Sequence, residues 1–89
     1  MMKGTATVAG ELGLHLRAAA RLVSITSQAR GPVRVSANGA TVDGKSLLGI
    51  TSLLAGHGTQ IDVEVDHDAD AAVLQEVLEL VAGGPDTAG

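Results

Sequence analysis

The 89-residue sequence has no cysteine and no phenylalanine, tyrosine or tryptophan. Without cysteine there can be no disulfide framework, thiolate metal ligand or cysteine nucleophile, and a small chain that folds without such cross-links fits a reducing compartment. Without aromatic rings there is no platform on which single-stranded nucleic acid could stack. The core must therefore be built from aliphatic side chains.

Positive charge is also scarce, because 6 Lys and Arg residues stand against 10 Asp and Glu residues, which gives a net charge of −4. This balance argues against a nucleic-acid partner, since no footprint for a phosphate backbone is expected. No apolar run is long enough to span a bilayer, and no apolar segment of signal-peptide length follows Met1. The sequence therefore predicts a cytoplasmic protein that does not insert into membranes.

Hydrophobic periodicity predicts the element order β-α-β-β-α-β-α. The expected strands cover residues 5–8, 33–36, 40–42 and 60–65, and the expected helices cover residues 16–29, 46–54 and 69–82. The dipeptide Asn38-Gly39 favours a hairpin, which implies antiparallel pairing. We expect an α+β protein, an open-faced β-sandwich in which three helices cover one face of a four-stranded antiparallel sheet. Residues 1–83 would form one domain and residues 84–89 a disordered tail.

Two helices have faces that the spacing predicts. On the first helix, the apolar residues share one side; they are Ala18, Ala19, Leu22, Val23, Ile25 and Ala29. On the second helix, Ser46 is expected to cap the N-terminus. Leu47, Ile50 and Leu54 would form its inward stripe, and Leu48 would be an exposed apolar contact.

Residues 39–46 fit a phosphate-binding loop, because they read GATVDGKS. Such a loop follows a buried parallel strand, whereas Gly39 is expected in a hairpin turn, and nucleotide-hydrolysing domains usually need well over about 100 residues. Nucleotide hydrolysis, which would need Lys45 and Ser46, is therefore the less favoured interpretation.

Asp66, Asp68 and Asp70 imitate the start of a calcium-binding loop. Ala71 replaces the required glycine and Val77 the bidentate glutamate, so we predict no metal site and no cofactor.

His15 is the histidine with the most useful position, because it lies at the expected N-terminus of the first helix. Free backbone amides and the helix dipole attract anions there and favour a neutral, nucleophilic imidazole. A phosphoryl group on this ring would gain hydrogen bonds from the amides, and Arg17 could add a charged contact. The alternative interpretation gives neither residue a function: His15 would be an ordinary, partly buried histidine, and Arg17 a solvated residue of the first turn. His57 lies in a predicted turn that could approach the same surface.

Two blocks of the sequence resemble the HPr family of phosphocarriers in the phosphoenolpyruvate-dependent sugar phosphotransferase system. The first, residues 7–20, reads TVAGELGLHLRAAA; the second, residues 44–53, reads GKSLLGITSL and follows the hairpin. The resemblance implies that enzyme I phosphorylates Nδ1 of His15, that Arg17 assists, and that IIA domains of sugar permeases receive the phosphoryl group. It also implies that an HPr kinase/phosphorylase could modify Ser46.

The resemblance further implies a small apolar docking surface made by Leu16, Ala18, Leu47 and Leu48. Two of these residues depart from the family, which usually has proline in place of Ala18 and a small residue in place of Leu16. Two related functions remain open: a regulatory phosphoprotein, and a carrier for a non-permease acceptor such as a dihydroxyacetone kinase system.

Overall fold

The computed structural model describes residues 1–83, so the predicted disordered tail, residues 84–89, lies outside the described residues. Four strands form one sheet in the order β1-β4-β2-β3, and every neighbouring pair is antiparallel. The strands are β1 (Met2–Thr7), β2 (Val33–Ala37), β3 (Ala40–Asp43) and β4 (Gln60–Val65).

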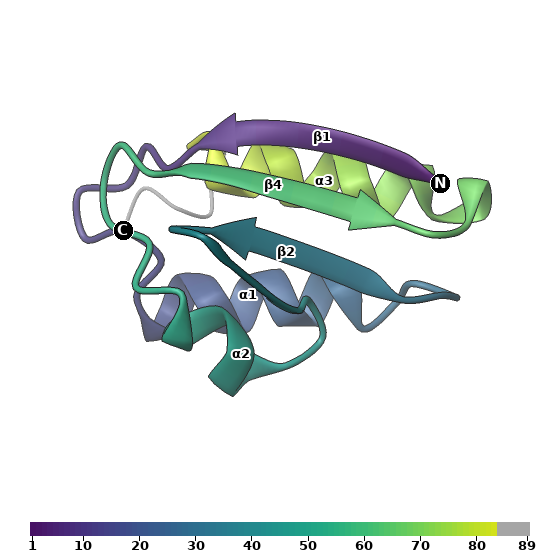
Figure 1. Ribbon diagram of the computed structural model, residues 1–89, viewed down its shortest axis with the longest axis horizontal. Coiled ribbons are helices and arrows are strands. Elements are labelled where there is room, and N and C mark those ends of the chain that lie inside the picture. Colours follow the sequence, from purple (N-terminus) through teal and green to yellow (C-terminus); the bar gives the residue numbers. More distant parts are fainter. Residues whose placement is uncertain (84–89) are drawn as a thin grey trace.

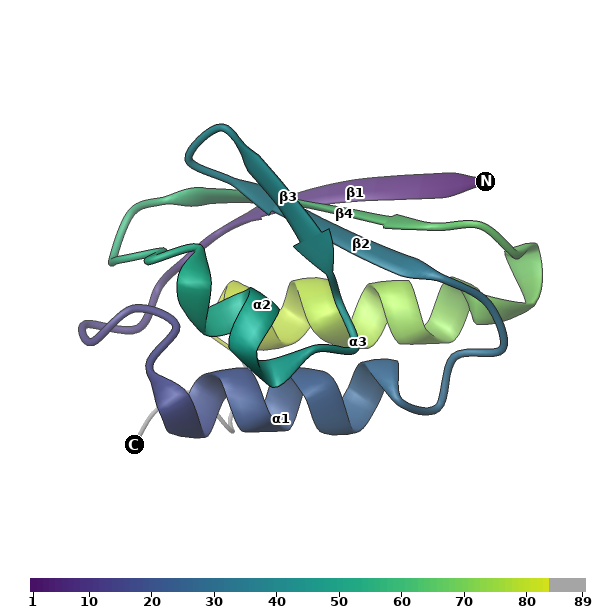
Figure 2. The ribbon, with the colours of Figure 1, turned by 60° about the horizontal axis from the view of Figure 1, so that its bottom comes forward.

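Three α-helices cover one face of this sheet, as Figures 1 and 2 show. They are α1 (Leu16–Thr26), α2 (Leu47–Ser52) and α3 (Ala71–Val81), and a short 3₁₀ helix, η1 (Asp68–Asp70), precedes the last of them. α3 packs against β1 and β4, whereas α2 packs against β3 and α1. The predicted element order and fold class are confirmed.

The core is aliphatic throughout. Inward positions alternate along the two central strands: Val33 and Val35 of β2, and Ile61 and Val63 of β4, are almost fully buried. Leu22 of α1 has no exposed surface. Burying one such side chain contributes about 1.5–3 kcal/mol, so repeated small contributions replace the large aromatic contacts that the sequence lacks.

The β2–β3 hairpin turns at Asn38 and Gly39, whose φ angles are 52° and 81°. Positive φ at both positions is typical of the type I′ turn, in which asparagine followed by glycine is favoured. Ala40–Asp43 is therefore extended strand, and the strand–loop–helix arrangement of a phosphate loop is absent from residues 39–46. The Lys45 ammonium donates instead to the backbone oxygen of Ala29, at 3.0 Å.

α1 is three residues shorter than the spacing predicted, because it ends at Thr26 rather than at residue 29. After Thr26 the backbone tightens: Gln28 and Ala29 donate to carbonyls three residues earlier. The Thr26 hydroxyl, which is buried, also donates to Gly44 O at 2.7 Å and so ties the end of α1 to the segment before α2.

The predicted inward stripe of α2 is wrong at its end. α2 stops at Ser52, and Leu54 has a φ of 53° and an exposure of 84%. Leu53, 3% exposed, takes its place in the core, and Ile50 is buried as predicted. Leu47 is also more exposed than predicted, at 36%.

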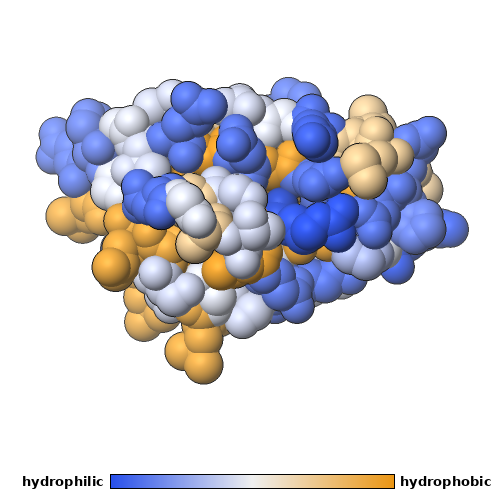
Figure 3. Space-filling model, in the orientation of Figure 1, coloured by the Kyte–Doolittle hydropathy of each residue, from blue (hydrophilic) through white to orange (hydrophobic). Residues whose placement is uncertain are grey.

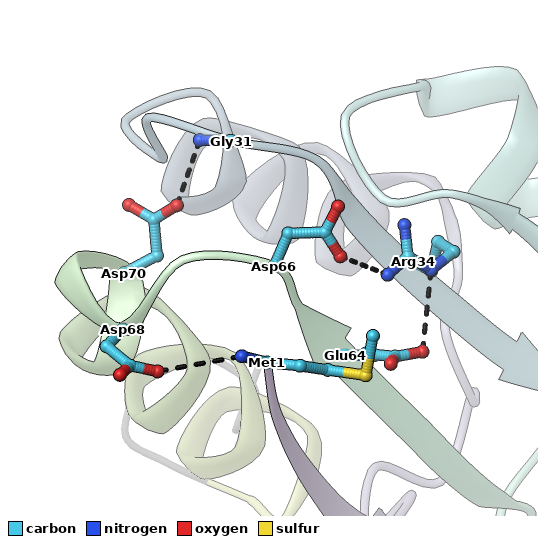
Figure 4. A network of polar contacts seen from close by, with 7 residues as sticks. All are labelled: Met1, Gly31, Arg34, Glu64, Asp66, Asp68 and Asp70. Atoms are coloured by element: carbon cyan, nitrogen blue, oxygen red, sulfur yellow. Dashed lines mark hydrogen bonds and ion pairs between the residues drawn. The ribbon is translucent and has the colours of Figure 1, made fainter.

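The three aspartates that imitate a calcium loop have different partners (Figure 4). Asp66 pairs with Arg34, and this guanidinium holds the pKa of the Asp66 carboxyl below its usual range. Asp68 is exposed and lies 3.6 Å from the N-terminal ammonium of Met1. Asp70 turns back toward the loop that follows α1. The carboxylates therefore do not converge on one centre.

Asp70 is 2% exposed and accepts hydrogen bonds from the backbone amides of Arg30, at 2.8 Å, and Gly31, at 3.0 Å. These two bonds hold the pKa of Asp70 below its usual range. Since the folded pKa lies below the unfolded value of about 4, the carboxylate contributes stability above about pH 4, and this contribution is lost as the pH falls toward the folded pKa.

Asp70→Asn should therefore lower the free energy of unfolding at about pH 7 and flatten its decline between about pH 5 and pH 3. The amide keeps the shape but loses the charge and one acceptor. Urea unfolding at a series of pH values measures both effects, and Asp68→Asn, an exposed neighbour, is the control. An Asp70→Asn profile as steep as that of the unmodified protein would contradict the role given to Asp70.

Candidate functional site

His15 is the N-cap residue of α1. Its backbone is extended, with φ −68° and ψ 175°, and its carbonyl accepts the first helical hydrogen bond, from Ala19 N at 2.8 Å. Its side chain folds over the helix end, so that Nδ1 accepts from the backbone amide of Arg17 at 3.2 Å. An accepting nitrogen carries a lone pair. His15 therefore lies at the helix N-terminus, as predicted, and its Nδ1 lone pair is directed at the backbone amides there.

The amides around this nitrogen suit an anion. Among residues 1–83, the amides of Leu16 and Ala18 donate to no other group, as expected for a first helical turn. A negatively charged group on Nδ1 would replace the ring as partner of the Arg17 amide, and the helix dipole would favour it. The side chain of Arg17 is exposed and belongs to the same turn.

The loop before His15 is held by the segment that follows α2. Leu14 N donates to Ala55 O at 2.8 Å. Gly13 has a φ of 68°, and a side-chain carbon there would lie 2.5 Å from Ala55 O. Only glycine fits both the conformation and the space. This contact brings the start of α1 against the end of α2.

An open pocket of about 340 Å³ lies where these segments meet, beside His15. Its lining includes Leu12, Leu16, Thr51 and Leu54. Leu12 and Leu54 are 77% and 84% exposed, so their side chains stand at the rim of the pocket. The histidine therefore lies at the edge of an apolar surface.

Leu54 is held in its left-handed conformation by the hairpin. The side-chain amide of Asn38 donates to Leu53 O at 2.9 Å and to Leu54 O at 3.5 Å. A side chain of the β2–β3 turn thus fixes the backbone at one wall of the pocket.

The docking residues suggested by the resemblance divide into two groups. Leu16, Leu47 and Leu48 are 64%, 36% and 81% exposed. Apolar surface gathers over α2 and the loops beside it, at the lower left of Figure 3. Ala18 is only 4% exposed because its side chain packs into the core, so it is removed from the predicted docking surface.

Ser46 lies at the other end of α2. Its Oγ accepts from Gly49 N at 3.0 Å, as predicted for an N-cap. Thr51, which lines the pocket, is five residues further along, about 7–8 Å at the rise of an α-helix. Ser46 is not among the residues that line the pocket, and neither is the exposed turn residue His57.

Four residues of this region were missed by sequence reasoning: Leu12, Gly13, Asn38 and Leu54. A usable signal existed for two of them, since Leu12 and Leu54 are large apolar residues in or beside glycine-containing loops. Asn38 was recognised only as a turn residue, because its contact with Leu53 spans 15 positions of the sequence.

A family model described as the PTS HPr component phosphorylation site matches residues 2–83. The chain belongs to this family. HPr is a phosphocarrier of the phosphotransferase system and not a catalytic enzyme, and this assigns the chain its broad role. None of the helices formed by residues 1–83 is long and apolar enough to cross a bilayer.

Relatives agree with this assignment in sequence and in structure. The chain is 34% identical to the phosphocarrier protein HPr of Cupriavidus necator and 36% identical to that of Xylella fastidiosa, over 92% and 90% of each protein. The crystal structure of HPr from Thermoanaerobacter tengcongensis superposes with a TM-score of 0.84 at 26% identity, over 91% of both chains. HPr from Bacillus anthracis gives 0.83 at 26% identity, over 90% of this chain and 95% of that one.

The conformation of Leu54 predicts an unusual response to mutation. The left-handed region costs a residue with a side chain about 1–2 kcal/mol, and the greater freedom of glycine in the unfolded chain offsets about 0.5–1 kcal/mol. Leu54→Gly should therefore leave the free energy of unfolding unchanged or raise it by up to about 1.5 kcal/mol.

Leu54→Ala is the matched control, because it removes the side chain but keeps the strained backbone. It should be about 1 kcal/mol less stable than Leu54→Gly in urea unfolding. If Leu54→Ala were instead the more stable variant by about 0.5–1 kcal/mol, the difference expected from chain entropy alone, the backbone of Leu54 would store no strain.

Proposed function

We propose that residues 1–83 form a carrier domain that accepts a phosphoryl group on Nδ1 of His15 from phosphorylated enzyme I in the cytoplasm. The group would then pass to IIA domains of sugar permeases. In the first step the Nδ1 lone pair attacks phosphorus, a P–Nδ1 bond forms, and the bond to the donor breaks with its electron pair leaving on the donor. The second step is the same exchange with His15 as the leaving group.

The observation that carries this proposal is the hydrogen bond from Arg17 N to His15 Nδ1. This bond supports the proposal, because the proposed attacking atom accepts it and so faces donors that suit a phosphoryl group. The amides of the first turn and the Arg17 guanidinium supply charge-assisted hydrogen bonds after transfer. The same backbone amides would therefore have a hydrogen-bond acceptor before phosphorylation, in Nδ1, and after it, in the phosphoryl oxygens.

The exposed leucines beside this site support transient contact with partner proteins. Leu16, Leu47 and Leu48 offer apolar surface without burying it in the fold. A small apolar patch beside a charged group is suited to brief encounters, in which partners must separate after each transfer.

Incubation with phosphoenolpyruvate and enzyme I tests the proposal. Intact-mass spectrometry should show an acid-labile phosphoryl adduct that is absent in His15→Ala and present in Lys45→Ala. Arg17→Ala should slow transfer by about tenfold to 100-fold, the loss expected for one charge-assisted hydrogen bond. An adduct that survives in His15→Ala, or ATP hydrolysis lost only in Lys45→Ala, would refute the carrier function.

We also propose that phosphorylation of Ser46 by an HPr kinase/phosphorylase slows this relay. The hydroxyl caps α2, where a phosphate would be electrostatically tolerated. The added charge would stand beside Leu47 and Leu48, so a partner that packs against these leucines would have to desolvate it.

Ser46→Asp should slow phosphoryl transfer from enzyme I by about tenfold or more. Ser46→Asn is the matched control, since asparagine caps a helix as well as aspartate but carries no charge. It should transfer at a rate close to that of the unmodified protein. Equal rates for both variants would mean that charge at position 46 does not regulate transfer.

A further inference from the structure

The leucines at the rim of the His15 pocket have no evident structural role. Leu12 and Leu54 are more than three-quarters exposed, so the core gains little from them. Leu54 also holds a backbone conformation that glycine would adopt without strain. Strain of this kind persists where the surrounding structure enforces it, and it gathers at functional sites.

We propose that Leu12 and Leu54 form an apolar collar that protects the phosphohistidine at His15 from water. This inference deepens the proposed function and rests on it. The collar residues line the same pocket as His15, and they belong to the two segments that the contact between Gly13 and Ala55 holds together. They would therefore flank a phosphoryl group carried by the ring.

The reaction that the collar opposes is hydrolysis. A water oxygen attacks phosphorus opposite Nδ1, a P–O bond forms, and the P–N bond breaks with its electron pair returning to Nδ1. Inorganic phosphate leaves, and the proton lost by the water is shared between phosphate and imidazole. Leucine side chains offer this water no hydrogen-bond partner, so they disfavour an ordered water in line with the bond. A partner protein would not be excluded in this way, because its apolar surface can pack against the two leucines while its own nucleophile reaches the phosphorus.

Asn38 acts as a positioning residue for this collar. Its side-chain amide donates hydrogen bonds from the hairpin to Leu53 O and Leu54 O at the pocket wall. Since Asn38 has a φ of 52°, replacement by glycine keeps the turn conformation and removes only the side-chain donor. Asn38→Gly should therefore loosen Leu54 without breaking the hairpin.

Phosphoramidate tests the collar without any partner enzyme, because this small donor phosphorylates histidine directly. The protein is loaded, the donor is removed, and decay of the adduct that is absent in His15→Ala is followed by intact-mass spectrometry. Leu12→Ala, Leu54→Ala and Leu54→Gly should each shorten the lifetime by about threefold to tenfold, and Asn38→Gly by a similar factor. Leu48→Ala is the control: this residue is 81% exposed but does not line the pocket.

Lifetimes in the Leu12 and Leu54 variants equal to that of the unmodified protein would overturn the proposal, as would an equal loss in Leu48→Ala. Leu54→Gly separates the collar from folding stability, because it is expected to be no less stable and yet to hydrolyse faster. If the adduct on His15 forms but its lifetime is the same in all variants, the collar is refuted and the proposed carrier function is not. No adduct on His15 from either phosphoramidate or enzyme I would refute both.

Discussion

The hydrogen bond between Arg17 N and His15 Nδ1 gives one atom two functions. Nδ1 caps the first helix and is also the atom with a lone pair that faces the exposed amides. Histidine is not among the favoured N-cap residues, which are serine, threonine, aspartate and asparagine. A phosphoryl group on Nδ1 would provide oxygens that cap the same amides better than the ring does. The site would therefore stabilise the proposed charged adduct with backbone amides that the helix leaves unsatisfied in any case.

The geometry of this cap depends on contacts far away in the sequence. Gly13 and Leu14 rest on Ala55, so the loop that carries His15 is positioned by the segment after α2. That segment is fixed in turn by Asn38, on the hairpin at the edge of the sheet. At the far end of α1, Thr26 is bound to Gly44. The core contains no aromatic side chain, and aliphatic side chains can pack in several similar arrangements. These specific polar contacts therefore help to select one orientation of the helices.

Much of this arrangement could be predicted because it follows from local periodicity. Alternation along residues 60–65 and the Asn38-Gly39 turn predict the antiparallel sheet, and the amphipathic helix after His15 predicts that this residue lies at a helix N-terminus. Ala18 is instructive: helical spacing placed it on the buried face, the resemblance placed it on the docking surface, and the structure agrees with the spacing. The end of α2 was not predictable, since a six-residue helix has too few periodic positions to show where it stops. The left-handed turn at Leu54 depends on Asn38, which no local pattern reveals.

The two ends of α2 lie at two different surfaces, the Ser46 end and the His15 pocket, and a substitution at each would have a different effect. At its N-terminus, Ser46 is about 7–8 Å along the helix from Thr51 in the His15 pocket, close to the Debye length of about 8 Å at physiological ionic strength. A charge at Ser46 would therefore be partly screened at Thr51, whereas a partner seated on Leu47 and Leu48 would meet it directly. Beyond the C-terminus of the helix, Leu54 lines the same pocket as His15 and carries no charge. On the proposals above, modification of the first end would alter which proteins dock, while side-chain volume at the second end would determine how much water reaches the phosphorus. A helix of only six residues suffices to keep these two effects apart.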